Sequence, residues 1–158
     1  KGITAIRNLS LVTVEGRVMQ GVTGVAGRVF SAVARSGANI LMITQSSSEQ
    51  SICFVVRTVD AAEVVRTLRA EFELELMRRD IDDIARQDEA SIVAVVGAGM
   101  RGKPGIAAAV FGALDDAGIN IISIAQGSSE YNLSLVTTNG DVDRAVLAIH
   151  SRFRLGQD

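Results

Sequence analysis

The stretch Asn39-Ile40-Leu41-Met42-Ile43-Thr44-Gln45-Ser46-Ser47-Ser48-Glu49 occurs again 81 residues later as Asn120-Ile121-Ile122-Ser123-Ile124-Ala125-Gln126-Gly127-Ser128-Ser129-Glu130. The same offset joins like residues along the whole chain without an insertion or a deletion. Such pairs include Gly16 with Gly97, Met19 with Met100, Gly24 with Gly105, Phe30 with Phe111, Gly37 with Gly118 and Phe72 with Phe153. The chain is therefore two copies of one module, and a functional interpretation has to use both copies.

The composition limits the class of protein. Each of two modules in 158 residues is small enough to hold only a marginal core, so we expect the modules to pack on each other. A hydrophobic content of 47% with 22% charged residues is typical of a soluble globular protein, and no apolar run reaches the ~20 residues of a membrane span. The net charge of -2, with dispersed Arg and Lys, disfavours nucleic acid as a partner. Cys53 is the only cysteine, which excludes an internal disulfide and favours the cytoplasm.

Hydrophobic periodicity predicts the elements of the first module. Strands are expected at 9–14, 40–44, 51–57 and around Leu74-Met77, with one helix from Val22 to its C-cap at Gly37 and another that begins at an Asp60 N-cap. This order is βαββαβ, the ferredoxin-like arrangement of an α+β fold, in which an antiparallel sheet carries helices on one face.

The second module repeats this order but lacks its last strand. We predict strands at 91–96, 120–125 and 131–137 and helices around 106–114 and 145–153, after which no alternating stretch remains. The segment 2–6 has the right length to supply the missing strand. We therefore expect a first module at 8–80 inserted within a second module made of 1–7 and 84–158. Since the chain opens on Lys1-Gly2-Ile3 without an initiator Met, we also expect it to be an excised piece of a larger protein.

One motif points misleadingly to a dinucleotide. Gly97-Ala98-Gly99-Met100-Arg101-Gly102 follows a strand and satisfies G-x-G-x-x-G. However, Pro104 sets the helix start beyond the third glycine, Gln126 stands near the place of the acidic ribose ligand, and the first copy has Val18 in place of the middle glycine. Dinucleotide binding is therefore disfavoured.

The remaining reactive residues do not form an active site. His150 is predicted to lie on the exposed side of a helix, and Cys53 within an apolar strand is predicted to be a core residue. Asp82 and Asp83 are expected to lie in a solvated turn. We expect no catalytic residue and no metal site in this chain.

The repeated polar residues suggest a ligand site. Gln45 and Gln126 end predicted strands, where each amide either ties down its own serine-rich turn or faces a small polar ligand between modules. The glycine loop from Met19 to Val25 favours the ligand, because glycines admit a ligand to backbone N–H groups and the following helix N-terminus suits a carboxylate. Asn39 and Asn120 are open to either reading, since they also suit plain turns. The expected ligand is small and zwitterionic.

These motifs resemble the C-terminal regulatory region of aspartate kinases, a tandem pair of ACT domains. The resemblance rests on Met-x-Gly-x-x-Gly before a helix, then Asn-Ile, then Gln-Ser-Ser-Ser-Glu or Gln-Gly-Ser-Ser-Glu, and it covers essentially the whole chain. It implies a non-catalytic module that binds an end-product amino acid and forms a homodimer through ACT sheet pairing. It also implies a kinase domain of the same chain that uses ATP and Mg to phosphorylate L-aspartate.

The resemblance also implies the effector and its contacts. Lysine-responsive relatives carry an acidic residue in the second strand, where this chain has Leu41 and Ile122, so L-threonine is expected and L-lysine is the alternative. The implied effector-binding residues are Met19, Val22, Gly24, Val25, Asn39, Ile40 and Gln45 in one copy and Met100, Lys103, Gly105, Ile106, Asn120, Ile121 and Gln126 in the other. Because Lys103-Pro104 replaces Val22-Thr23, one or two sites per chain are both open. Two other functions stay open as well: an assembly module without a ligand, and an amino-acid sensor attached to another enzyme.

Overall fold

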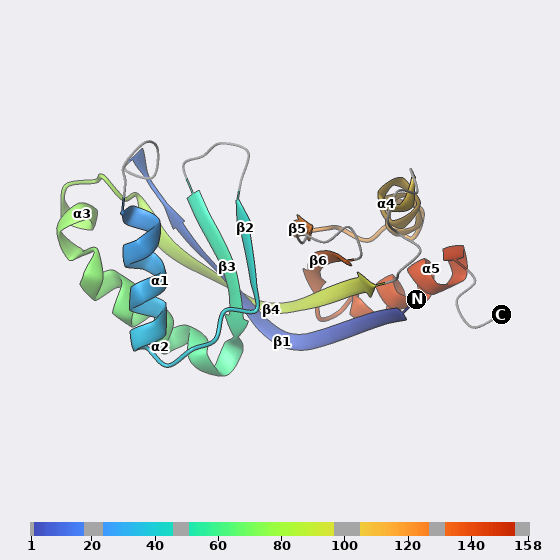
Figure 1. Ribbon diagram of the computed structural model, residues 1–158, viewed down its shortest axis with the longest axis horizontal. Coiled ribbons are helices and arrows are strands. Elements are labelled where there is room, and N and C mark those ends of the chain that lie inside the picture. Colours follow the sequence, from blue (N-terminus) through green and yellow to red (C-terminus); the bar gives the residue numbers. More distant parts are fainter. Residues whose placement is uncertain (1, 18–23, 46–50, 97–104, 127–131, 154–158) are drawn as a thin grey trace. The chain divides into compact units, whose positions relative to one another are not determined.

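The structure, a computed structural model, describes residues 2–17, 24–45, 51–96, 105–126 and 132–153 (Figure 1). The chain folds into two compact units. Leu9–Asp88 forms one, which we call the inserted unit, and Lys1–Asn8 with Glu89–Asp158 forms the other, which we call the split unit. Two 14-residue strands, β1 (Gly2–Glu15) and β4 (Asp83–Val96), each contribute residues to both units.

The inserted unit has the order strand, helix, strand, strand, helix, strand. Its elements are the second part of β1, α1 (Val25–Arg35), β2 (Met42–Gln45), β3 (Ser51–Arg57), α2 (Thr58–Glu71), α3 (Glu73–Met77) and the first part of β4. The strand order is β2-β3-β1-β4, and β3 is antiparallel to both β1 and β2. Alternate strand residues face α1 and α2, so that Val12, Val14, Phe54 and Val56 share a core with helix residues such as Val29, Val64 and Leu68.

The split unit repeats this arrangement. It contains the first part of β1, the second part of β4, α4 (Ile106–Asp116), β5 (Ser123–Gln126), β6 (Asn132–Thr138) and α5 (Val142–Phe153). The strand order is β1-β4-β6-β5, and β6 is antiparallel to β4 and β5. Ile3 and Ala5 pack against its core, so the segment 2–6 is a strand, as predicted. The predicted α+β fold with two ferredoxin-like βαββαβ modules is confirmed.

The predicted strand around Leu74-Met77 was wrong. Residues 73–77 form the short helix α3, in which the Leu76 N–H donates to the Phe72 carbonyl (2.9 Å). Leu74 and Met77 are 51% and 76% exposed, so their alternation with glutamates does not mark a buried face. Leu, Glu and Met all favour helices, and this preference wins where no neighbouring strand is available.

Three smaller expectations were also wrong. Helix α2 begins at Thr58, so Asp60 lies in its first turn rather than at the N-cap, where its carboxylate still suits the helix dipole. Asp83 begins β4 rather than a turn. Cys53 is half-buried on the strand face opposite Phe54, and its Sγ lies 3.4 Å from Thr13 Oγ1 instead of in the core. Among the described residues, every helix is too short or too polar to cross a membrane.

Candidate functional site

Both of the repeated helices begin at a glycine with a left-handed backbone. Gly24 precedes α1 with φ 94°, and Gly105 precedes α4 with φ 89°. A Cβ added at either position would meet nothing within 4 Å, so glycine is required for its φ angle rather than for space. Because glycine has no side chain to cap a helix, the first-turn N–H groups of α1 and α4 receive no hydrogen bond from it. Such N–H groups are suited to a carboxylate.

The repeated glutamines lie at matching ends of the two edge strands. Gln45 is the last residue of β2 and pairs with Ile52, while Glu15 at the end of β1 pairs with the adjacent Ser51. The ends of β1 and β2 therefore lie at the same end of the inserted unit, where α1 begins (Figure 1). The structure thus brings Gly24, Val25 and Gln45 to one end of this unit.

Asn39 and Ile40 lie at the other end of β2. The Leu41 N–H donates to the Val55 carbonyl (2.8 Å), which places this end of β2 beside the C-terminal part of β3. Asn39 and Gln45 are six positions apart, a reach of up to about 20 Å in extended chain. Asn39 is exposed, and Ile40 is half-buried against the helix-side core. Within one unit, these two residues are not brought to Gly24 and Gln45.

The split unit places its predicted residues in the same way. Gly105 and Ile106 begin α4, and Gln126 ends β5 opposite Leu133. Asn120 and Ile121 precede β5, where the Ile122 N–H donates to the Val136 carbonyl (2.8 Å). Four predicted residues lie outside the described residues: Met19, Val22, Met100 and Lys103. The side chains of Gln45 and Gln126 also lie outside the described part of the structure.

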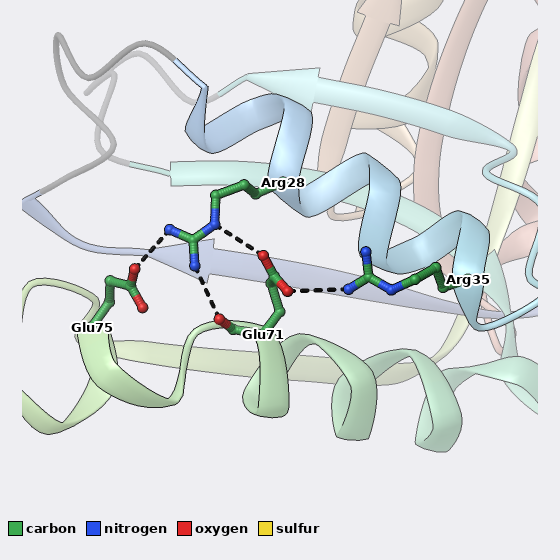
Figure 2. A network of polar contacts seen from close by, with 4 residues as sticks. All are labelled: Arg28, Arg35, Glu71 and Glu75. Carbon is green, nitrogen blue, oxygen red and sulfur yellow. Dashed lines mark hydrogen bonds and ion pairs between the residues drawn. The ribbon is translucent and has the colours of Figure 1, made fainter.

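A charge network fixes the first turn of α1 in the inserted unit (Figure 2). The Arg28 guanidinium donates to Glu71 Oε1 (2.9 Å), to Glu75 Oε1 (2.6 Å) and to the Glu71 carbonyl (3.0 Å). It also lies 4.5 Å from the centre of the Phe72 ring, a cation–π distance. Arg35, two turns further along α1, donates to Glu71 Oε2 (3.1 Å). The network therefore ties α1 to the end of α2 and to α3.

This network is electrostatically matched. Hydrogen bonds from Arg28 lower the pKa of Glu71 and of Glu75 below their ordinary value of 4.5, so both carboxylates are charged at neutral pH. Sequence analysis missed the network. Its available signal was the spacing of Arg28 and Arg35 by seven residues, which places both on one face of α1.

Among the described residues of the split unit, one ion pair lies at the matching place, with its charges reversed. Asp116 on α4 accepts from Arg152 on α5 (2.7 Å), at the positions that match Arg35 and Glu71. Ala109 stands where the first copy has Arg28. The two candidate sites therefore share their glycine and glutamine but differ in what fixes the first turn of the helix.

Comparison with known proteins agrees with this geometry. The family model described as "ACT domain" matches residues 12–72 and 93–153. A bifunctional aspartokinase/homoserine dehydrogenase of Daucus carota, described as chloroplastic, is 44% identical over 157 residues, which is 99% of this chain and 17% of that protein. The enzyme of the same name from Haemophilus influenzae is 47% identical over 151 residues, 95% of this chain and 18% of that protein.

A solved structure shows the same fold over nearly the whole chain. The regulatory subunit of aspartate kinase from Thermus thermophilus, in its ligand-free form, superposes with a TM-score of 0.78 at 25% identity and covers 97% of both chains. The present chain spans less than a fifth of the length of the curated bifunctional relatives that it matches.

Proposed function

The chain belongs to the ACT-domain family, and from that premise we propose that it is the feedback-regulatory region of an aspartate kinase and that its effector is L-threonine. The observation that carries the proposal is the repeated combination of a glycine-started helix with an edge strand that ends in glutamine, Gly24 with Gln45 and Gly105 with Gln126. The names of the relatives support aspartate kinase as the parent. The kinase reaction, with ATP, Mg and L-aspartate, and a cytoplasmic location are parts of this proposal.

The positions of the site residues favour an effector bound between two modules. Gln45 and Asn39 lie at opposite ends of β2, which is an edge strand of the sheet. If β2 pairs antiparallel with β2 of a second copy, Gln45 of one copy approaches Asn39 and Ile40 of the other. The effector carboxylate would then bind the first-turn N–H groups of α1, and the glutamine amide would contact its polar groups.

The local charges favour threonine over lysine. A lysine side chain would require a carboxylate for its ammonium group. The chain offers Leu41 and Ile122 directly before β2 and β5, and the acidic residues beside α1, Glu71 and Glu75, are already paired with Arg28. An effector with a short, neutral hydroxyl side chain is compatible with this pattern.

Regulation follows if the effector binds one arrangement of the protein more tightly than another. Differential binding then shifts the equilibrium toward the arrangement in which the kinase is inactive. A coupling of about 1–3 kcal/mol per site is typical of such regulation.

The test is isothermal titration of the 158-residue chain with L-threonine, with L-lysine and L-aspartate as comparisons. We expect saturable heat with threonine alone. Gln45→Ala and Gln126→Ala should weaken binding in the same assay because each removes an amide contact. Gln87→Ala, an exposed glutamine on β4, is the matched control and should leave binding unchanged.

Each other outcome has a distinct meaning. Heat with lysine alone would replace threonine by the alternative effector. Heat with none of the three amino acids would favour the assembly module and contradict the proposed function. Unchanged binding in the Gln45→Ala, Gln126→Ala double variant would remove the glutamines from the site.

A further inference from the structure

The segment Glu73–Asp82, which we call the α3 segment, makes two contacts within the inserted unit, one with the end of β1 and one with the start of α1. At one end, the Asp82 N–H donates to the Glu15 carbonyl (2.7 Å). A Cβ added at Gly16 would collide with the backbone of Asp80 and Ile81, so the end of β1 lies directly against this segment. At the other end, Glu75 accepts from Arg28 in the first turn of α1 (2.6 Å).

The α3 segment is itself well anchored. The N–H groups of Asp80 and Ile81 both donate to the Glu75 carbonyl (2.9 and 3.1 Å), and Ile81 is buried in the helix-side core. Glu75 Oε2 is buried and has no hydrogen-bond partner among the described residues. Loss of Arg28 would therefore leave a largely buried carboxylate without its charged partner, which is costly.

Arg28 is poorly placed to bind a ligand directly. Each of its three guanidinium nitrogens already donates to Glu71 or Glu75, and the two carboxylates offset its positive charge. Its geometric effect is to hold the first turn of α1 against α2 and α3. The split unit has Ala109 at this position, and an alanine makes no ion pair.

We infer that Arg28 is a positioning residue that sets the effector affinity of the inserted unit, by holding the first turn of α1 in the orientation in which its N–H groups bind the effector carboxylate. The inference rests on the proposed function and deepens it. If only a fraction of molecules has this turn in place, the apparent Kd rises by the inverse of that fraction. The two sites of one chain should therefore differ, with the tighter site in the inserted unit.

The test compares Arg28→Gln with Arg152→Gln in titrations with L-threonine, or with whichever amino acid gives saturable heat with the unaltered chain. Arg152→Gln is the matched control because it removes the Asp116–Arg152 ion pair of the split unit. We expect Arg28→Gln to raise the Kd of the tighter site by about threefold or more and Arg152→Gln to leave that Kd unchanged. Arg28→Lys keeps the positive charge but has one nitrogen in place of the three that donate to Glu71 and Glu75. Its Kd should therefore lie between those of the unaltered chain and Arg28→Gln.

A second readout separates positioning from general destabilisation. Amide hydrogen exchange should accelerate in Arg28→Gln from residue 28 onward in α1, where the N–H groups donate within the helix, while the β3 amides keep their protection. If Arg28→Gln does not fold, Glu75→Gln removes one contact of the same network and should raise the Kd in the same direction. An unchanged Kd in Arg28→Gln, or an equal rise in Arg152→Gln, would overturn the inference and leave the proposed function standing. No binding by the unaltered chain would instead overturn the proposed function.

Discussion

At the scale of single residues, two side-chain-bearing residues adopt a left-handed backbone at the boundary between the units. Asn8 has φ 61° and Glu89 has φ 57°. Asn8 is supported by Asn139, whose Oδ1 accepts from the Asn8 N–H and whose Nδ2 donates to Asn8 Oδ1, both at 3.2 Å. Asparagine tolerates this conformation, whereas glutamate does not favour it.

We therefore expect Glu89→Asn to stabilise the protein by about 0.5–1 kcal/mol, because it relieves part of the backbone strain at an exposed position. Glu89→Thr should destabilise it, since a β-branched residue suits a left-handed backbone least. Urea unfolding at pH 7 measures both. Equal stability of the two variants would show that the φ angle at residue 89 carries no strain.

Site residues that the two copies share could be recognised from the sequence, whereas a residue present in one copy only could not. Gly24 with Gly105 and Gln45 with Gln126 stood out because the two copies share them, and a repeat reveals what its copies have in common. Arg28 has alanine at the matching position, so the same comparison could not reveal it. Asn39 and Ile40 also recur in the second copy, and the resemblance to aspartate kinases assigned them to the same site as Gln45, although they lie at the other end of β2.

At the scale of helices and strands, periodicity predicted the four longer helices but missed the first part of β4 and failed for the shortest helix. Residues 51–57 were predicted as a strand and form β3 over the same residues. The alternation at Leu74-Met77 was misread because a five-residue segment fits a strand and one helical turn equally well, and only its surroundings decide. The last strand of the inserted unit is the first part of β4 instead, which continues without interruption into the split unit.

Ion pairs join the helices of each unit with opposite charge order. In the inserted unit α1 carries the arginines and α2 and α3 the glutamates, whereas in the split unit α4 carries Asp116 and α5 carries Arg152. Pairing α1 with α5 would place like charges together, and so would pairing α4 with α2. The reversal therefore favours each helix pairing within its own unit in a chain of two similar modules.

The pKa values of the α1–α2–α3 network predict a pH dependence of stability. Arg28 lowers the pKa of Glu71 and Glu75, so their stabilising contribution is complete above the ordinary value of 4.5 and is lost as the pH falls through the lowered values. We expect Arg28→Ala to cost about 1–2 kcal/mol in the free energy of unfolding at pH 7. Urea titrations should show this difference shrinking as the pH falls below 4.5 and through the lowered pKa values of both carboxyl groups. A difference that stays constant down to pH 3 would contradict the electrostatic origin and leave only the contact with Phe72.

At the scale of the whole molecule, the sheet ends in two exposed edge strands, β2 and β5. Ile43 on β2 and Ile124 on β5 are matching residues of the repeat and are 50% and 47% exposed. Edge strands with exposed isoleucines are suited to pairing with another strand, and a charged residue there opposes such pairing. We propose that these edge strands make the side-by-side association of a homodimer.

The Ile43→Lys, Ile124→Lys double variant should accordingly be monomeric in sedimentation velocity at concentrations where the unaltered chain is a dimer. It should also lose threonine binding, because Gln45 of one copy would no longer meet Asn39 and Ile40 of the other. The single variants Ile43→Lys and Ile124→Lys then show whether β2 or β5 forms the dimer contact. Leu147→Lys, at a 66% exposed position on α5, is the matched control and should remain dimeric with full binding. A monomeric double variant that still binds threonine with full affinity would place the whole site within one chain and exclude the shared-site arrangement.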